Sequence, residues 1–167
     1  MKKTKRIAVV ALNIALAFAL SFLESLIPFN FGVPGVKIGL ANIVVCTAVY
    51  TLDRRDAFFI SMVRILLSGL LFSGAFSLLY SFAGGIVSFL VMILLTKSDR
   101  FSPIGVCVAG AVSHNLAQII VASLVMKTNI IVFYFPVLLF TGAAAGVGVG
   151  LLCAVIIRRV EKIYGRK

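Results

Sequence analysis

Charge is scarce in this 167-residue chain, and negative charge is scarcer than positive charge, with five acidic residues against sixteen Lys and Arg. Charged residues make up 13% of the sequence, where an ordinary soluble domain has about a quarter. Hydrophobic residues make up 62%, and the mean hydropathy is +1.17. Such a chain has too little polar surface to cover a globule in water. The composition argues against a soluble enzyme and predicts one integral membrane domain, residues 1–167.

The signatures of common catalytic and metal sites are also missing. No HExxH, CxxC or GxSxG pattern occurs, and His114 has no second metal ligand at helical spacing. Cys46, Cys107 and Cys153 have no paired or metal-ligand spacing, so we interpret them as small buried apolar residues. The sequence therefore predicts no catalytic residues, no metal and no cofactor.

The only close pair of acidic residues is Asp53 and Asp56, which flank Arg54 and Arg55. A prenyl diphosphate synthase holds several Mg²⁺ ions in aspartate-rich clusters, and two carboxylates beside two arginines do not supply such a cluster. We interpret this pair as solvated charge that caps a helix.

Long apolar runs divide the chain into six segments. In hydrocarbon only helices or closed barrels satisfy the backbone hydrogen bonds, and these runs lack the alternation of barrel strands. We therefore predict an all-α bundle of six transmembrane helices. The second and third are short for full spans, and are expected to be tucked against neighbours or bent, whereas the sixth is long. The spans lie near Ile7–Ile27, Ile38–Leu52, Ala57–Phe72, Leu78–Thr96, Ile104–Met126 and Ile130–Ile157.

The basic residues gather on one side of these spans. They cluster at 2–6, 54–55, 97–100 and 158–167, whereas only Lys37 and Lys127 fall on the other side and Arg64 lies within a span. The positive-inside rule then places both termini in the cytoplasm and the chain in the cytoplasmic membrane. The net charge of +11 is thus a sign of topology and not of nucleic-acid binding. The first span is longer than the core of a signal peptide, and five spans follow it.

Polar side chains within the spans point to a binding site, because each costs at least a few kcal/mol in lipid. Most of them fall in the outer half of the membrane, which suits a pocket that opens to the outside. Each one alone is also explained by an interhelical hydrogen bond, or by a Glu24–Arg64 pair. As a group they favour a small-molecule site. That predicted site consists of Glu24, Lys37, Asn42, Arg64, His114, Asn115 and Gln118, with Asn13 as a further polar residue of the first span.

Two prolines and two glycines in Pro28–Lys37 indicate a turn-rich segment between the first two spans. Its aromatic side chains would anchor it at the membrane interface, or the segment would cover the pocket as a lid. Ser73–Ser77 is predicted to be a short outer loop beside the same mouth.

A stripe of small residues marks one face of the first span, where close approach of another helix is possible. The neighbour is either the rest of the bundle or a partner subunit. A comparable stripe in the sixth span is interpreted as internal packing. The first stripe is Ala8, Ala11, Ala15 and Ala19, and the second is Gly142, Gly146 and Gly150.

Four separated strings, Pro34–Asn42, Arg64–Gly69, Ser73–Ser81 and Gly110–Gln118, resemble bacterial membrane proteins described as the Gx transporter family or heptaprenyl diphosphate synthase component I. The resemblance covers nearly the whole chain. That family is similar in turn to the substrate-binding S components of energy-coupling factor (ECF) vitamin transporters. Those are six-helix proteins whose first helix docks the energy-coupling subunit through an AxxxA motif, which Ala11, Ala15 and Ala19 match here.

The resemblance implies a non-enzymatic protein that captures a small molecule from outside and works with an energy-coupling transmembrane subunit and separate ATPases. The alternative is a non-catalytic membrane subunit, component I, of heptaprenyl diphosphate or quinone metabolism or of an associated electron-transfer system. That subunit would hold a lipid substrate or a soluble enzyme at the membrane. A channel or ion-coupled carrier is less supported, because no inverted repeat or broken helix pair is visible.

Overall fold

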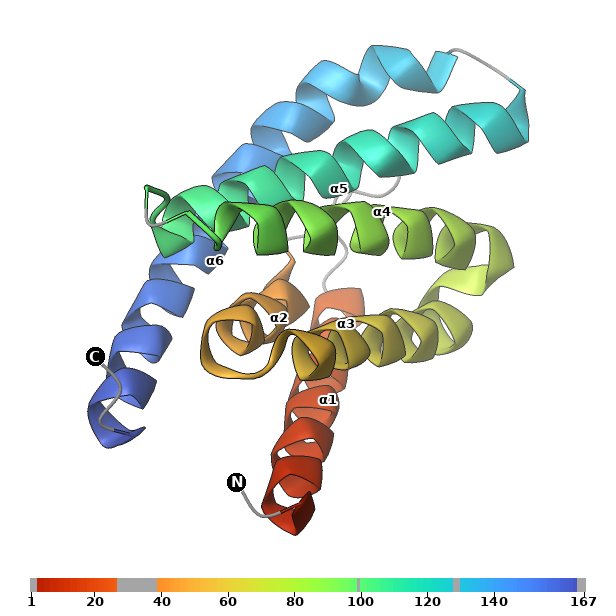
Figure 1. Cartoon of the computed structure of the whole chain (residues 1–167). Helices are drawn as coiled ribbons and strands as arrows, with labels where there is room; N and C mark the ends of the chain where they lie inside the picture. Colours follow the sequence, from red (N-terminus) through yellow and green to blue (C-terminus); the bar gives the residue numbers. More distant parts are fainter. Residues whose placement is uncertain (1–2, 27–38, 99, 128–129, 165–167) are drawn as a thin grey trace.

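The structure is a computed structural model of the chain, and it describes residues 3–26, 39–98, 100–127 and 130–164. Every regular element in this part is helical, as the sequence predicts (Figure 1). A π-helical turn, Gly69–Ser73, joins the third helix to the fourth, and a 3₁₀ turn, Ile130–Tyr134, precedes the sixth. The six helices are α1 (Lys3–Leu26), α2 (Leu40–Thr51), α3 (Arg54–Ser68), α4 (Gly74–Leu95), α5 (Pro103–Met126) and α6 (Phe135–Tyr164).

The outer surface of the bundle is apolar. Leu124 and Phe140 are 73% and 74% exposed, and large apolar side chains of this kind occur on every helix except the buried α2. Exposed apolar surface on this scale requires a non-aqueous environment. Four helical segments in the described part are long and apolar enough to cross a membrane, namely Lys3–Leu26, Ser77–Leu95, Pro103–Met126 and Val132–Ile163. The chain is therefore an all-α membrane protein.

The short helix α2 lies at the centre of the bundle. It packs against α1, α3 and α6 and also touches α4, and half of its 12 residues are buried. At 1.5 Å per residue it is about 18 Å long, well short of a hydrocarbon layer of about 30 Å. The expectation that the second apolar segment is tucked against its neighbours is confirmed. Because α2 is enclosed by other helices, it supplies core side chains and little lipid-facing surface.

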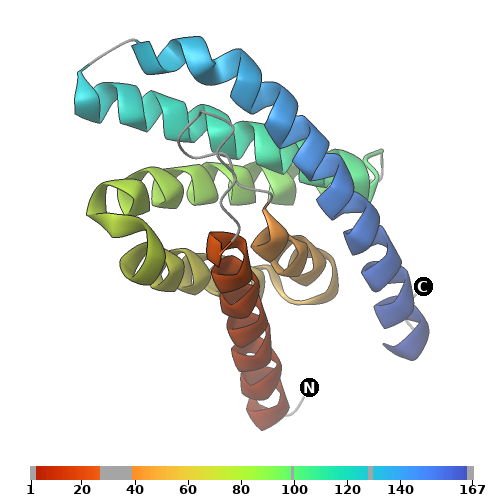
Figure 2. The ribbon, with the colours of Figure 1, turned by 180° about the vertical axis from the view of Figure 1, so that it is seen from behind.

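Helix α1 lies at the edge of the bundle, where it packs chiefly on α2 and α3 (Figure 2). Near its start, Arg6 Nε and Nη2 donate to the two carboxylate oxygens of Asp56 at 2.7 and 2.8 Å. The Asp56 side chain is only 15% exposed, so its interpretation as a solvated charge is wrong. Asp53 occupies the N-cap position of α3 but makes no side-chain capping bond, and it lies 3.6 Å from Arg6 instead. Arg6 belongs to another helix, 50 residues before Asp56, and it contacts both carboxylates, which is why local sequence did not reveal the contact.

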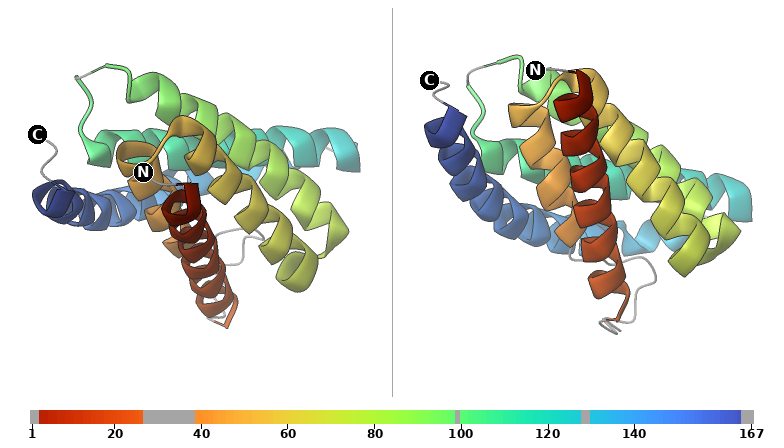
Figure 3. Two further views of the ribbon diagram at one scale, coloured as in Figure 1. Left: turned by 60° about the horizontal axis from the view of Figure 1, so that its bottom comes forward. Right: turned by 90° about the horizontal axis from the view of Figure 1, so that it is seen from below.

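The basic segments lie together at one end of the molecule. Figure 3 shows the start of α1, the α2–α3 and α4–α5 connections and the end of α6 toward the same end. The turn from α3 to α4 and the end of α5 lie toward the opposite end. The fold therefore brings together the clusters that the sequence sorted to one side of the membrane.

One connection and one helix differ from their predicted form. Ser73–Ser77 was expected to be a loop, but the chain passes through the π turn, and residues from Gly74 onward are already helical. Helical turns satisfy their own backbone groups, which an apolar environment favours over an open loop. A Cβ at Gly69 would lie 3.0 Å from Leu78 Cβ, so this glycine permits the tight reversal. The sixth helix is also longer than predicted, since α6 continues beyond Ile157 to Tyr164.

The glycine stripe of α6 faces α5, which confirms its interpretation as internal packing. A Cβ on Gly146 would lie 2.7 Å from Val108 Cα, and one on Gly150 would lie 2.6 Å from Ile104 Cα. A backbone atom cannot move aside as a side chain can, so the two helices approach this closely only where glycine is present.

We predict that Gly146→Ala destabilises the protein by about 1–3 kcal/mol, because the new methyl group overpacks the α5–α6 contact. Gly148 on the same helix provides the matched control, since a Cβ there would meet no atom within 4 Å. Gly148→Ala should leave stability unchanged or raise it by up to about 1 kcal/mol through helix propensity. Reversible unfolding of the detergent-solubilised variants measures both, and an equal loss in the two would contradict the close contact.

Candidate functional site

A cavity of about 90 Å³ lies inside the bundle, with walls from all six helices; we call it the polar cavity. Because about 10–15 Å³ of such space is enough for one water, it has room for several waters or a small polar group. Lys37, one of the seven predicted site residues, lies outside the described residues, as does the whole predicted lid or anchor segment Pro28–Lys37. The other six all line the cavity, and they are Glu24, Asn42, Arg64, His114, Asn115 and Gln118.

Arg64 places a guanidinium group from α3 in the wall of this cavity. Its Nη2 donates to Asn42 Oδ1 at 3.2 Å, whereas its enclosed Nε has no hydrogen-bond partner in the described part of the chain. Glu24 attracts the group electrostatically, but none of the ion pairs among the described residues joins the two. The guanidinium thus has a hydrogen bond to one neutral amide, and its acidic neighbour in the cavity, Glu24, is not in ion-pair contact with it in the described part of the chain. Such a group favours an anionic partner, because its planar fork matches a carboxylate or phosphate.

Glu24 has a structural contact that sequence reasoning missed. Its Oε1 accepts a hydrogen bond from the backbone N–H of Gly39, the N-cap residue of α2. Gly39 has φ +79°, a left-handed conformation that favours glycine. A carboxylate at a helix N-terminus is also stabilised by the helix dipole. Glu24 therefore ties the end of α1 to the start of α2 at the wall of the polar cavity.

The two amide side chains of α5 connect it to its neighbours. Asn115 Nδ2 donates to the Leu138 carbonyl of α6 at 2.8 Å, and Gln118 Nε2 donates to Ser81 Oγ of α4 at 3.4 Å. The sequence left two roles open for these residues, ligand binding and hydrogen bonding between helices. The hydrogen bonds between helices are present for both. They do not exclude a role in binding, because both residues line the cavity as well.

His114 and Asn13 have different surroundings. His114 lines the cavity beside Gly84 of α4, where a Cβ would lie 3.0 Å from His114 Cε1. A glycine at this position leaves the space that the imidazole occupies. Asn13 is not among the lining residues, and its Nδ2 donates to the Val9 carbonyl of its own helix at 2.8 Å. Asn13 is therefore satisfied locally.

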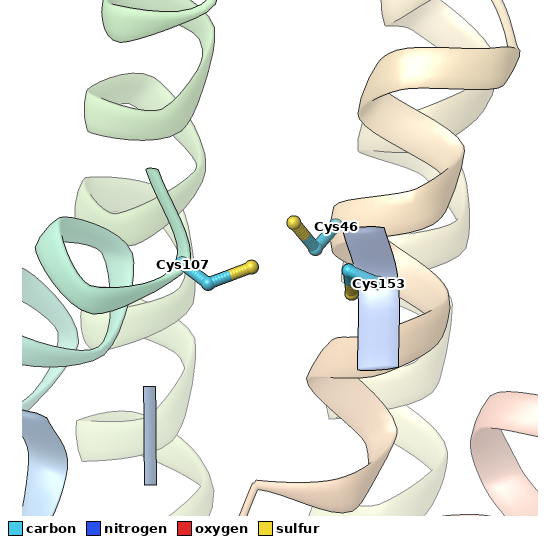
Figure 4. A group of neighbouring side chains, drawn as sticks. All are labelled: Cys46, Cys107 and Cys153. Carbon is cyan, nitrogen blue, oxygen red and sulfur yellow. The ribbon is translucent and has the colours of Figure 1, made fainter. Parts of the chain in front are cut away.

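Three cysteines meet one helical turn along α2 from Asn42. Cys46 of α2, Cys107 of α5 and Cys153 of α6 have their Sγ atoms within 4.8 Å of one another, and we call them the cysteine cluster (Figure 4). All three are buried free thiols, as the sequence predicts for small apolar residues. Their convergence is a feature that the spacing of the cysteines in the sequence did not reveal. Spacing rules detect ligands that share a short segment, and these thiols come from three helices.

The alanine stripe of α1 points away from the bundle. Ala8, Ala11, Ala15 and Ala19 are all exposed, and the neighbouring Leu12 and Leu16 are 70% and 51% exposed. No other described helix covers this face. The alternative of internal packing is therefore wrong for α1, in contrast to the glycine stripe of α6.

The heptaprenyl diphosphate synthase component I family has a model that matches residues 14–156. The chain belongs to this family. The match confirms the family resemblance of the sequence motifs, and it includes the six described cavity residues of the predicted site and the cysteine cluster. The family description names a component of a synthase, and it does not say which reaction, if any, that component carries out. No curated protein and no solved structure matches the chain.

We predict that Asn115→Ala lowers the free energy of unfolding by about 1 kcal/mol, the typical contribution of an interhelical hydrogen bond in a membrane protein. Ser113→Ala is the control, because Ser113 Oγ donates to the Gly110 carbonyl at 3.0 Å within the same helix. The control should show a clearly smaller change. Both values come from unfolding titrations in mixed micelles, and wild-type stability of Asn115→Ala would show that the bond to Leu138 does not hold α5 and α6 together.

Proposed function

We propose that this protein is the substrate-binding subunit of a membrane uptake system, similar to the S components of ECF transporters. It captures a small polar solute from the extracytoplasmic side in the polar cavity and hands it over together with a separate energy-coupling module. The observation that carries the proposal is the convergence of six polar side chains on one cavity inside an apolar bundle.

The energetic argument concerns the cost of these groups in lipid. Apolar side chains of similar volume would stabilise the bundle at lower cost, because a charge inside a membrane carries a large desolvation penalty. Hydrogen bonds between helices account for Asn115 and Gln118. Arg64 also makes such a bond, from Nη2 to Asn42, but its charge and its Nε, which lacks a partner in the described part of the chain, are not accounted for by it. A bound solute offsets that penalty.

Arg64 also defines the chemistry of the solute. Glu24 lies in the same cavity but makes no ion pair with Arg64 among the described residues, so the guanidinium is left to bind an acidic group of the solute. A carboxylate accepts two parallel N–H donors from such a group. The cavity of about 90 Å³ is small beside drug-sized sites of about 300–1,000 Å³, so it favours a small solute. We therefore propose a small carboxylate-bearing molecule.

The proposed topology has six membrane segments with both termini in the cytoplasm. The basic segments lie at one end of the molecule, and the positive-inside rule assigns that end to the cytoplasm. Glu24 lies near the other end of α1, two residues before the helix ends at Leu26. In this orientation the cavity wall formed by Glu24 and Gly39 lies toward the outside.

The energy-coupling partner docks on the exposed alanine face of α1 in this proposal. Ala11, Ala15 and Ala19 present only methyl groups, so a second transmembrane helix can approach the backbone closely. ATP hydrolysis takes place on the partner's cytoplasmic subunits, and this chain contributes no catalytic residue. It acts in the lipid bilayer and needs neither a cofactor nor nucleic acid.

The family description favours a second candidate, a non-catalytic component I of heptaprenyl diphosphate metabolism or of an associated electron-transfer system. In that role the protein holds a prenyl chain or a soluble enzyme at the membrane. The two candidates differ in what the bundle retains, because one binds a polar solute and the other an apolar chain.

We predict that native mass spectrometry of the protein, purified from its own membranes, detects a bound small polar molecule. Asn42→Ala should abolish that mass difference, because Asn42 lines the cavity and positions the Arg64 guanidinium. Asn13→Ala, the same substitution at a locally satisfied site on α1, should retain it. A bound prenyl chain would instead favour the component I role, and retention of the solute by Asn42→Ala would contradict the assigned site.

We predict that Ala15→Leu reduces co-purifying ATPase activity about tenfold or more, since overpacking a close helix contact costs about 1–3 kcal/mol. Ala144→Leu is the matched control, because Ala144 is an exposed alanine on α6, away from the stripe. Solute binding should survive in both variants. Absence of ATPase activity from the wild-type preparation, or its retention by Ala15→Leu, would contradict docking through this face.

A further inference from the structure

We propose that the cysteine cluster is a binding site for a soft metal ion, and that Cu(I) is the ion it fits best. Nothing in the proposed uptake function requires such a site. It uses neither the carboxylate-bearing solute nor the energy-coupling partner, so the two proposals stand or fall separately.

The distances between the sulfur atoms suit three-coordinate binding. A metal–thiolate bond of about 2.3 Å places three sulfurs of a trigonal site about 4.0 Å apart. The Sγ atoms lie within 4.8 Å of one another, and Figure 4 shows the sulfur of Cys107 pointing toward the other two. Each sulfur therefore needs to move inward by about 0.5 Å or less to reach bonding distance.

The donor set selects the type of metal. No His, Asp or Glu joins the three thiols within the described ranges, so the ligands are sulfur alone. Soft thiolates favour Cu(I) and Zn(II) over Mg²⁺, Ca²⁺ or Mn²⁺, which take oxygen ligands. Structural Zn(II) requires four ligands in a tetrahedron, whereas Cu(I) is satisfied by three in a plane. A three-sulfur site without a fourth protein ligand therefore fits Cu(I).

The surroundings of the cluster suit a metal in its reduced state. Val149 and Ile157 pack with the cysteines in one buried apolar core, which keeps bulk water away. Cys46 and Cys107 also line the polar cavity, which gives the ion an entry path. The cysteine cluster is thus buried on one side and accessible from the cavity on the other.

Binding exchanges protons for the metal without any change of oxidation state. Each thiol loses its S–H proton to the cavity as a Cu–S bond forms, so three protons are released and neither copper nor sulfur is oxidised. The S–H contact of Cys153 with the Ile43 carbonyl, 3.3 Å long, is lost in this step. Thr47 Oγ1, 3.8 Å from the same sulfur, remains as a hydrogen-bond donor to the thiolate.

The test is a Cu(I) titration of the full-length, detergent-solubilised protein under anaerobic, reducing conditions. Bicinchoninate holds Cu(I) in a coloured complex, and loss of that colour measures transfer to the protein. We expect one Cu(I) per chain, and copper X-ray absorption that shows sulfur ligands alone. Changes around a metal ligand already cost 10–100-fold in affinity, so each of Cys46→Ser, Cys107→Ser and Cys153→Ser should cost about 100-fold or more.

Ser88→Ala is the matched control, because Ser88 is a buried polar residue of the same cavity without a thiol. It should bind Cu(I) with unchanged affinity, and unfolding midpoints identify any cysteine variant that fails to fold. Wild-type affinity in all three folded serine variants, nitrogen or oxygen ligands at the copper, or tighter binding of Zn(II) would each overturn the proposal. Isolation of the cluster as a disulfide that binds no Cu(I) after reduction would overturn it as well.

Discussion

The placement of a guanidinium group inside an apolar bundle is the constraint to which the rest of the cavity responds. Arg64 needs polar neighbours, and Asn42 of α2 supplies one through its amide oxygen. That contact requires α2 to lie deep between the other helices, where half of its residues are buried. Glu24 adds a favourable field from α1 while it binds the first turn of α2. The charge of Arg64, the short central helix α2 and the contact of Glu24 with the start of α2 are thus linked to one another.

Close backbone packing makes this arrangement possible. Gly146 and Gly150 bring α6 against the backbone of α5, and Gly84 leaves room on α4 for His114. Small residues therefore serve two purposes in the bundle. Some of them allow two helix backbones to pack closely. Such van der Waals contact stabilises helix pairs in lipid, where the hydrophobic effect does not drive helices together. Others leave the space into which a polar side chain projects.

The sequence predicted the parts of this structure that depend on composition and on position along a helix. Six helices, the apolar exterior and the polar residues of the cavity follow from the rule that lipid rejects charge. The sequence did not reveal the contacts that depend on which helices become neighbours in the folded bundle. The meeting of Cys46, Cys107 and Cys153, the pairing of Arg6 with Asp56, and the capping of Gly39 by Glu24 all join distant segments. The prediction of a loop at Ser73–Ser77 was wrong for another reason. Glycine and serine favour loops in water, but in this bundle the segment is helical.

Helix α1 is fastened near both ends by ionic or charge-assisted contacts, Arg6 with Asp56 at one end and Glu24 with Gly39 at the other. These contacts fix the position of α1 along α2 and α3. One of them, between Glu24 and Gly39, lies in the wall of the polar cavity. A single helix therefore carries both the exposed alanine face and part of the cavity wall, so a contact made on its outer face is one helix diameter away from the space around Arg64, about 10 Å.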